Sequence, residues 1–357
     1  MPTIDIIGAG VAGLALAAAL DRPGWRVRLH DDRPEEARVG TAFGMWPAAM
    51  DALERIGVAE RVRERGVLIN DATVHSRDGH RLQRVSGADV WMVTRPDLRL
   101  LLRAQVPPTA EFVPHRVTDP THLDGDVLVG ADGAHSVVRR HLWGARSGAR
   151  SARVTVLRGV VPQDLGLSEL EEWWGRGDQF GATPNPGATT NWFATMPEHR
   201  FPDSATALEH ARERYSDYPD RVPQVLGLAD PALTLVNGIS VSRPLTHLVS
   251  GHAVLIGDAA HVMAPNLGRG ACEAIRDAVR LGGLLSRHEP AEALARYRHQ
   301  RLVQPQLVKS AATVVMRVAL ADRLAPSRDR VLRLLARKPR QEAPAGSPGP
   351  TRSRGLG

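Results

Sequence analysis

The first twenty residues change from a strand-like to a helix-like hydrophobic pattern. Residues 4–7 form an apolar run interrupted only by Asp5, with the length and β-branched composition of a buried strand. Residues 8–13 contain three glycines, and residues 14–20 are rich in alanine and leucine. This order predicts a buried strand, a tight turn and a helix.

Similar patterns recur further along the chain. Helical apolar spacing occupies residues 48–56, where Gly57 supplies a C-cap, and another helix begins at Pro96. Residues 307–318 carry an apolar helical face, and we expect a kink at Pro305. The runs with the composition of strands are residues 26–30, 72–76, 89–94, 127–129 and 253–256.

Between residues 153 and 241 short apolar runs alternate with Gly, Pro and Asn turns. This pattern predicts an antiparallel sheet inserted into an α/β domain. We therefore expect a Rossmann-like domain made of residues 1–152 and 242–337, with helices at its C-terminal end. The inserted sheet, residues 153–241, forms a substrate domain and takes in part of residues 68–95. The Pro-, Gly- and Arg-rich residues 338–357 are expected to form a disordered basic tail.

Composition narrows the classes of protein to which this chain can belong. The 357 residues carry a net charge of +7, but no basic stripe or aromatic platform indicates nucleic-acid binding. The single cysteine, Cys272, excludes a disulfide framework and fits a reducing cytoplasm. No apolar run reaches the length of a membrane span. The histidines lack metal-ligand spacing, so we expect no metal site.

The glycines of the first turn are spaced for binding a dinucleotide. Gly8 allows the turn, Gly10 lets the backbone approach a pyrophosphate, and Gly13 lets helix and strand pack closely. Val11 and Ala12 lie in the first turn of the helix, where free N–H groups and the helix dipole attract phosphates.

An acid follows the second predicted strand at the position that the dinucleotide fingerprint requires. Asp31 lies about twenty residues after the glycines and can accept a hydrogen bond from a ribose hydroxyl; Asp32 follows it. An acid at this position disfavours a 2′-phosphate. The first site is therefore predicted to take FAD or NAD rather than NADP.

Two further strand ends carry an aspartate beside a glycine, at Asp132-Gly133 and Gly257-Asp258. In an open α/β sheet such strand ends converge on one crevice. Together the three motifs resemble those of the FAD-dependent aromatic hydroxylases, the single-component flavoprotein monooxygenases related to para-hydroxybenzoate hydroxylase. The resemblance extends from the start to about residue 320 and is loose in the inserted sheet.

The resemblance implies roles for several residues. Asp132 and Gly133 match the motif that serves both FAD and the reducing nicotinamide. Gly257 and Asp258 match the motif whose aspartate holds the ribityl chain of FAD. Arg95 matches an arginine that contacts FAD near its phosphates and ribityl chain. The loop before the flavin-facing helix is matched by Pro265, Gly268, Arg269 and Gly270.

Three residues depart from the family pattern. Asp31 replaces the more usual glutamate, Arg269 stands where glutamine is common, and Arg276 stands where an acid is common. Arg269 is expected to stabilise an anionic reduced flavin or to bind an anionic substrate; the alternative is that it points to solvent or forms a salt bridge with a neighbour. Arg276 is expected to lie on a solvated helix face. We expect His261 to be a packing residue and Cys272 to be a small buried core residue.

The mechanism that the resemblance implies uses FAD, NADPH or NADH, and dioxygen. Reduced flavin adds dioxygen to give a flavin hydroperoxide, which hydroxylates or epoxidises an aromatic or polycyclic small molecule. No catalytic side chain is expected, because the flavin does the chemistry. The pocket should lie between the flavin and the inserted sheet, although its candidate residues could also be core. These candidates are Phe43, Met45, Phe180, Trp192 and Pro265.

Other functions stay open at this point. A flavin-dependent reductase of a lipid double bond and a non-catalytic flavin-binding sensor would use the same motifs. A purely nicotinamide-dependent dehydrogenase is disfavoured by the motifs at Asp132 and Asp258. A halogenase is disfavoured because the chain lacks the tryptophan-isoleucine-proline signature and a suitably placed lysine.

Overall fold

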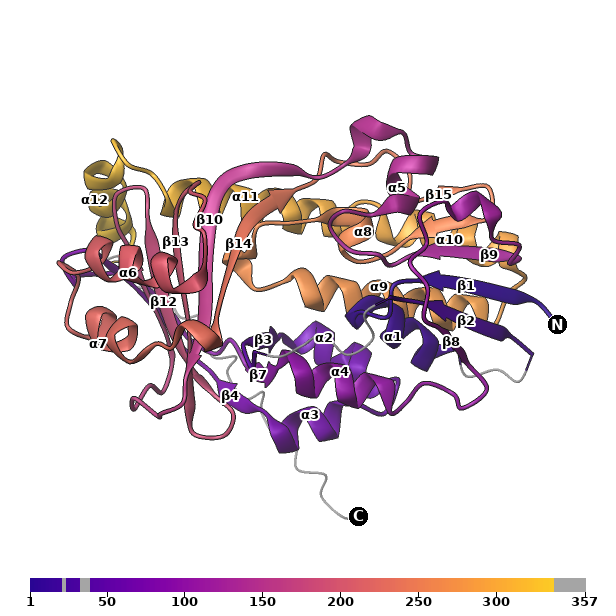
Figure 1. Ribbon diagram of the computed structural model, residues 1–357, viewed down its shortest axis with the longest axis horizontal. Helices are drawn as coiled ribbons and strands as arrows, with labels where there is room; N and C mark the ends of the chain where they lie inside the picture. Colours follow the sequence, from indigo (N-terminus) through magenta and orange to yellow (C-terminus); the bar gives the residue numbers. More distant parts are fainter. Residues whose placement is uncertain (21–23, 33–38, 337–357) are drawn as a thin grey trace, which may run out of the picture.

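The computed structural model describes residues 1–20, 24–32 and 39–336. Two large sheets lie side by side along the long axis of the molecule, with a small three-stranded sheet between them in the view of Figure 1. One large sheet is six-stranded and mostly parallel, and the other is seven-stranded and mostly antiparallel. The molecule is therefore an α/β structure, as the hydrophobic patterns predict.

The six-stranded sheet has the order β15-β16-β9-β1-β2-β8. Its central strand β1 pairs in parallel with β2 and β9, and only the edge strand β15 runs antiparallel. Helices cover both faces, so Ile4 and Ile6 of β1 are fully buried. The strands are β1 (Thr3–Ile7), β2 (Arg26–His30), β8 (Glu111–Val113), β9 (Val127–Gly130), β15 (Val249–Ser250) and β16 (Ala253–Leu255).

Two helices of this layer approach each other unusually closely. A Cβ added to Gly282 of α9 would lie 2.6 Å from the Cβ of Ala19 in α1, whereas one added to Gly283 would meet only the end of the Arg287 side chain, at 3.6 Å. The small residues of α1 therefore let α9 pack directly against its backbone. The helices of this layer are α1 (Val11–Ala19), α5 (Val137–Leu142), α8 (Asp258–His261), α9 (Gly270–Leu285) and α10 (Pro290–Arg301).

The seven-stranded sheet has the order β14-β10-β13-β12-β11-β5-β6. One of its faces packs on the helices α6 (Ser204–Arg214) and α7 (Arg221–Leu228), which the turn-rich sequence of this region does not predict. All pairs are antiparallel except β11 with β5. The strands are β5 (Ala72–Ser76), β6 (Arg81–Val85), β10 (Arg150–Val161), β11 (Leu170–Trp174), β12 (Gln179–Asn185), β13 (Thr189–Pro197) and β14 (Thr234–Val241).

The small sheet and its helices lie close to both large sheets. Its order is β3-β7-β4, and α4 follows β7 directly, with Thr94 accepting a hydrogen bond from the Asp97 N–H as the N-cap. The elements are β3 (Ala42–Met45), β4 (Val67–Ile69), β7 (Val90–Thr94), α2 (Pro47–Glu54), α3 (Ala59–Arg65) and α4 (Arg95–Arg103).

Two C-terminal helices, α11 (Gln304–Ala319) and α12 (Ala325–Ala336), lie along the upper side of the view in Figure 1. The kink expected at Pro305 is wrong, because Pro305 lies in the first turn of α11, where its missing N–H costs nothing. The apolar face predicted there is also largely solvent-exposed. The buried side chains of α11 are instead Pro305, Lys309, Ala312, Met316 and Ala319.

Within the described residues, no helix is both long and apolar enough to cross a membrane. The predicted tail, residues 338–357, lies outside the described part of the chain.

The close approach of α1 and α9 gives a matched pair of variants. Gly282→Ala should lower the free energy of unfolding by about 1–3 kcal/mol, because its methyl group would overlap Ala19. Gly283→Ala should leave stability unchanged or raise it by up to about 1 kcal/mol, because alanine is the better helix former. Urea denaturation of both variants measures the difference, and equal effects would contradict the close packing.

Candidate functional site

In the turn between β1 and α1, two glycines are tightly packed and a third has open space beside it. Gly8 has a φ of 103°, and a Cβ there would lie 2.5 Å from the carbonyl oxygen of Ala131, just after β9. A Cβ on Gly13 would lie 1.9 Å from the carbonyl oxygen of Gly8, whereas one on Gly10 would meet no atom within 4 Å. Packing thus requires glycine at positions 8 and 13 but leaves the space beside Gly10 open.

The predicted acid lies directly beside this turn. Asp31 follows β2, and its Oδ2 accepts a hydrogen bond from the backbone N–H of Ala9 over 2.7 Å. Asp32 is exposed next to it. Val11 and Ala12 begin α1 on the other side of the turn, and no side chain caps the helix at Gly10. The free N–H groups at the start of α1 and the carboxylate of Asp31 therefore lie at the same end of the six-stranded sheet.

The loop after β9 presents a second carboxylate. The Oδ2 of Asp132 accepts hydrogen bonds from the N–H groups of Val137 and Val138, at 2.6 and 3.3 Å, at the start of α5. Its Oδ1 is buried and has no partner among the described residues. A buried oxygen without a partner costs free energy, so this atom is suited to accept a hydrogen bond from a ligand. Gly133 follows with a φ of 76°.

The third carboxylate, Asp258, lies in a recess. Its side chain is accessible to solvent, yet enough protein surrounds it for burial to raise its pKa, against the lowering effects of His261, Arg95 and Arg139. Solvent therefore reaches Asp258 although protein surrounds it, and this partly enclosed space is called the recess below. It begins α8 directly after Gly257, whose φ of 58° turns the chain at the end of β16.

A buried arginine joins the second and third strand ends. Arg139 of α5 is fully buried and donates to the carbonyl oxygens of Asp258 (3.0 Å), Ala259 (2.7 Å) and Ala134 (2.6 Å). Its guanidinium thus connects the loop after Asp132 with the backbone of α8. Burial lowers the pKa of Arg139, and Asp132 and Asp258 oppose this effect.

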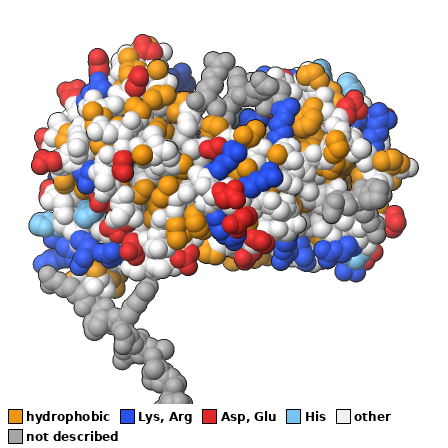
Figure 2. Space-filling view, turned by 90° about the horizontal axis from the view of Figure 1, so that it is seen from below, with side chains coloured by type: hydrophobic (Ala, Val, Ile, Leu, Met, Phe, Trp, Pro, Cys, Tyr) orange, Lys and Arg blue, Asp and Glu red, His pale blue; other side chains and the backbone are white. Residues whose placement is uncertain are grey.

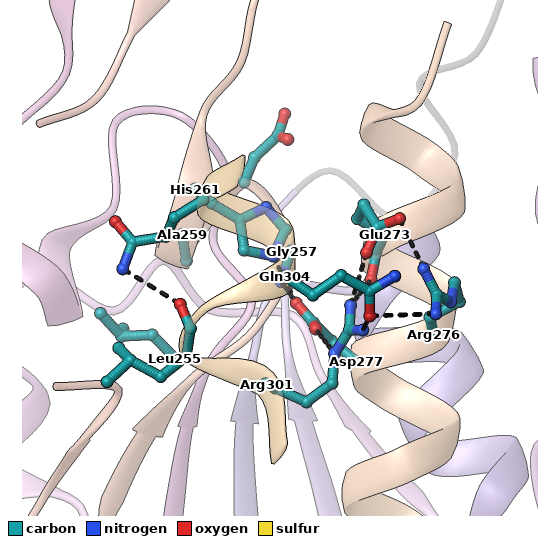
Figure 3. Close-up of polar contacts among 12 residues, drawn as sticks. Leu255, Gly257, Ala259, His261, Glu273, Arg276, Asp277, Arg301 and Gln304 are labelled. Carbon is teal, nitrogen blue, oxygen red and sulfur yellow. Dashed lines mark hydrogen bonds and ion pairs between the residues drawn. The ribbon is translucent and has the colours of Figure 1, made fainter. Parts of the chain in front are cut away.

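The turn at Gly257 is held from below by Asp277 of α9 (Figure 3). The Oδ2 of Asp277 accepts from the Gly257 N–H (2.9 Å) and from Nε2 of His261 (2.5 Å), and its Oδ1 accepts from Nε of Arg301 (2.6 Å). Burial acts to raise the pKa of Asp277, but His261 and Arg301 beside it hold the value at about 2. His261 is therefore a buried packing residue, as predicted.

Two further charged residues of α9, Glu273 and Arg276, belong to the same hydrogen-bond network. Arg301 donates to Glu273 over 2.7 Å, and Arg276 donates to the other oxygen of Glu273 over 2.8 Å. Arg276 also contacts Gln304. It therefore does not lie on the purely solvated helix face that the sequence suggested. Cys272 is buried, its Sγ contacts the carbonyl oxygen of Gly44, and burial raises the pKa of its thiol to about 11.

Arg95, the first residue of α4, and Arg158 of β10 enter the recess from different parts of the fold. The Arg95 guanidinium lies 4.1 Å from the ring centroid of Phe43. Burial and Arg158 lower the pKa of Arg95 to about 10, while Asp258 acts in the opposite direction. Arg95 is therefore close enough to interact electrostatically with both. Burial also lowers the pKa of Arg158.

The loop before α9 also borders this end of the molecule. Pro265 and Gly268 are exposed, and Gly268 adopts the left-handed conformation with a φ of 59°. No side chain caps α9, which begins at Gly270. The Arg269 guanidinium lies 4.8 Å from the ring centroid of Trp46, so it stacks on this aromatic ring. Arg269 has no acidic partner among the described residues.

Three of the five residues predicted to line the pocket are fully buried in hydrophobic cores. Met45 is fully buried in the core of the parallel layer. Phe180 and Trp192 are also fully buried and stack on each other, with ring centroids 6.2 Å apart, in the core that the sheet forms with α6 and α7. Strand alternation places them on the face away from Phe193. Phe43 is half-buried beside Arg95, and Pro265 is exposed in the loop before α9.

Sequence reasoning did not assign a role to Arg139, Asp277, Arg301 or Arg158. A signal existed for Asp277, because it lies on the apolar stripe of helix α9 between Ala274 and Leu281, where an unpaired charge would be costly. Arg158 lies within the apolar residues of β10 in the same way.

These features fit a dinucleotide. The open space beside Gly10 and the uncapped N-terminus of α1 suit a pyrophosphate. Asp132 offers an unpaired buried oxygen, and Asp258 offers an accessible one. A parallel sheet with an uncapped helix N-terminus and carboxylates at its strand ends is typical of a dinucleotide-binding protein.

Comparison with known proteins gives the family. The sequence profile of the FAD binding domain family matches residues 1–110 and 86–312. The chain is 34% identical to aurachin C monooxygenase/isomerase of Stigmatella aurantiaca, over 84% of this chain and 85% of that protein. It is 29% identical to 2-heptyl-3-hydroxy-4(1H)-quinolone synthase of Pseudomonas aeruginosa, over 88% and 89%. The crystal structure of Klebsiella pneumoniae HpxO with FAD and uric acid shares the fold, with a TM-score of 0.83, 23% identity and 93% of each chain covered.

The chain therefore belongs to the FAD binding domain family, within the FAD-dependent aromatic hydroxylases. It is an FAD-dependent monooxygenase for aromatic or polycyclic small molecules. FAD is its cofactor.

The open position in the glycine turn gives a specific test. Gly10→Ala should weaken FAD binding by about tenfold or more, because the added methyl group would occupy the space through which a pyrophosphate approaches. The thermal stability of the apoprotein should stay the same, because the methyl group meets no protein atom. Fluorescence titration with FAD measures the affinity, and Gly283→Ala serves as the control. An unchanged affinity would place the pyrophosphate elsewhere.

The network around Asp277 gives a pH-dependent prediction. Its pKa in the folded protein, about 2, is below the usual value of 3.8, so its contribution to stability is complete above about pH 4 and is lost as pH falls toward 2. This contribution is about 2 kcal/mol. Asp277→Asn should therefore destabilise the protein by about 1 kcal/mol more at pH 7 than at pH 3 in urea unfolding. Asp51→Asn, at an exposed position of α2, should have little effect at either pH; equal losses for Asp277→Asn at both would refute the pairing.

Proposed function

We propose that this enzyme uses NADPH or NADH and dioxygen to hydroxylate or epoxidise an aromatic or polycyclic molecule that carries an acidic ring oxygen. The observation that carries the substrate class is the Arg158 guanidinium in the recess. It has no acidic partner among the described residues, and its Nε is buried without a hydrogen bond. A partly buried cation of this kind is suited to bind an anion.

The position of Arg158 on its strand supports this role. Val154 and Val156 pack against Ala312 and Met316 of α11, whereas the alternate residues of β10 belong to the core beneath α6 and α7. Side chains alternate along a strand, so Arg158 lies on the same face as Val156. That face is directed to the parallel layer and to Arg95, with which Arg158 interacts electrostatically.

The residues that would hold FAD come from the three strand ends. Gly8, Gly10 and Gly13 with Val11 and Ala12 would receive the pyrophosphate, and Asp31 with Asp32 would face the ribose. Asp132, Gly133, Gly257, Asp258 and Arg95 would bind the central part of the cofactor. Pro265, Gly268, Arg269 and Gly270 would border the ring. The roles of these groups are proposals from the geometry above.

When bound, FAD supplies the redox and oxygen chemistry of this enzyme class. The chain contributes positioning and electrostatics. The uncapped N–H groups of α9 and the nearby Arg269 stabilise negative charge at that end of the recess. Arg158 favours the deprotonated form of a phenolic or enolic substrate, which increases the electron density of the ring. A ring with more electron density attacks an electrophilic oxygen more readily.

The names of several relatives agree with this class. Proteins similar to this chain include 3-amino-4-hydroxybenzoate 2-monooxygenase of Streptomyces cremeus and FAD-dependent urate hydroxylase of Klebsiella pneumoniae, which are 28% and 27% identical to it. Both named substrates carry acidic groups. The buried, unreactive Cys272 and the absence of any other cysteine fit a reducing compartment, and we propose the cytoplasm.

The activity is tested by supplying NADPH or NADH with a panel of hydroxyquinolines, phenols and indoles. The proposal expects oxidation of the nicotinamide coupled to oxygen uptake, with a product that is heavier by one oxygen atom. A flavin reductase of double bonds would give a product heavier by two hydrogens without oxygen uptake. A sensor would show no stimulated oxidation.

The role of Arg158 is tested with compounds from that panel. Arg158→Gln should raise KM for phenols about tenfold or more, because a charged hydrogen bond contributes about 1.5–3 kcal/mol. It should also shift the activity optimum to higher pH, where phenols ionise without help, and change KM for indoles less. Arg150→Gln, at the exposed start of the same strand, is the control. Equal effects on phenols and indoles would remove Arg158 from substrate recognition.

A further inference from the structure

The exposed apolar side chains of the described residues are concentrated in the C-terminal helices. Fourteen large hydrophobic side chains are exposed, and eight of them lie between residues 303 and 335. Soluble proteins rarely expose a contiguous apolar surface without a partner. The eight residues are Val303, Leu307, Val314, Val318, Leu324, Val331, Leu334 and Leu335, and together they are called the C-terminal apolar surface below.

Helices α11 and α12 expose these residues because their other faces pack against the rest of the protein. Helix α11 packs Ala312 and Met316 against β10, and the spacing of Leu307, Val314 and Val318 places them on one exposed side. Helix α12 is fixed by Arg328, whose buried guanidinium donates to the carbonyl oxygens of Trp174 and Gly175, at 3.1 Å each. The exposed leucines therefore do not contribute to the core.

The excess of basic over acidic residues is concentrated in the same C-terminal part of the chain. Residues 293–357 contain fourteen Lys and Arg but only three Asp and Glu, whereas the whole chain contains 46 and 39. Acids therefore outnumber bases in residues 1–292, and both signs lie side by side on the face seen in Figure 2. Five of the fourteen Lys and Arg lie outside the described residues and three are buried, so six are exposed in the described part of this region: Arg296, Arg298, Arg317, Arg323, Arg330 and Arg333. Arg330 and Arg333 are exposed on α12 beside Leu334. An exposed apolar surface surrounded by a strong local excess of positive charge is typical of a helix that binds a membrane surface.

Other occupants of this surface are less compatible with its chemistry. A second copy would bring the same excess of arginines into contact, and like charges oppose association. The chain's own last 21 residues contain one large aliphatic side chain, Leu356, and add five Lys and Arg, so they cannot cover eight apolar residues. The described part of residues 303–336 has no aromatic side chain on which bases could stack, as single-stranded nucleic acid requires.

We propose that α11 and α12 bind the surface of an anionic lipid bilayer through their exposed aliphatic side chains and the exposed arginines Arg317, Arg323, Arg330 and Arg333. The aliphatic side chains enter the boundary between headgroups and acyl chains, and the arginines pair with lipid phosphates. The enzyme would then lie on the membrane without crossing it. This inference does not depend on the identity of the substrate.

The test is flotation of the full-length, FAD-loaded protein with vesicles. Vesicles of phosphatidylcholine with about one third phosphatidylglycerol should bind the protein, and vesicles of phosphatidylcholine alone should bind it at least about tenfold more weakly. Raising the salt concentration from about 0.05 to about 0.5 M should reduce binding by a similar factor, because the ionic attraction is screened.

Two paired variants and one control locate the surface. Leu334→Gln with Leu335→Gln, and separately Arg330→Gln with Arg333→Gln, should each weaken binding to the anionic vesicles by about fivefold or more. Leu100→Gln, in α4 with 57% of its side chain exposed, should bind like the original protein. FAD content and melting temperature confirm that each variant is folded.

Three results would overturn the proposal. One is the absence of binding to anionic vesicles by the original protein. Another is equal binding by both paired variants and the control. The third is a stable dimer in light scattering that dissociates in Leu307→Gln, because the apolar surface would then belong to a second copy of the chain.

Discussion

The geometry of the site depends on the buried carboxylate of Asp277. A buried charge costs several kcal/mol unless every lone pair is used, and here the donors are a backbone N–H at Gly257, the His261 ring and the Arg301 guanidinium. They come from the turn after β16, from α8 and from α10. One carboxylate on α9 therefore fixes three other elements, and it holds Asp258 at the opening of the recess. Removal of any donor would leave an uncompensated charge.

A second buried charge completes this support. Arg139 connects the loop after β9 with α8 through three carbonyl oxygens, so the carboxylates of Asp132 and Asp258 are presented by a rigid framework. The opposite wall comes from the seven-stranded sheet, which brings Arg158 toward Arg95. Two cations held near each other repel, and this arrangement is favourable only with anionic groups between them. We propose that the fixed parallel layer binds the cofactor and that the second sheet presents the group that selects the substrate.

Much of the parallel layer could be predicted from the sequence, because short buried strands and glycine turns have local signatures. The turn at Gly8 and the acid at Asp31 follow from spacing alone. The side-chain network could not be predicted, because Arg301 and Asp277 are 24 residues apart and meet only through tertiary packing. Phe180 and Trp192 are pocket candidates because they belong to the inserted sheet, but the face of a strand on which a side chain lies depends on register. Helices α6 and α7 were missed because the region's glycine, proline and asparagine turns suggested only strands.

The central claim is that FAD lies across the three strand ends, between the parallel layer and Arg158. Hydrogen–deuterium exchange of the apoprotein and the FAD-loaded protein tests it directly, since it reports on every segment at once. The account predicts slower exchange on FAD binding in residues 8–13, 132–138 and 257–270, with little change in α6 and α7. Protection confined to other segments, or none at residues 257–270, would contradict it.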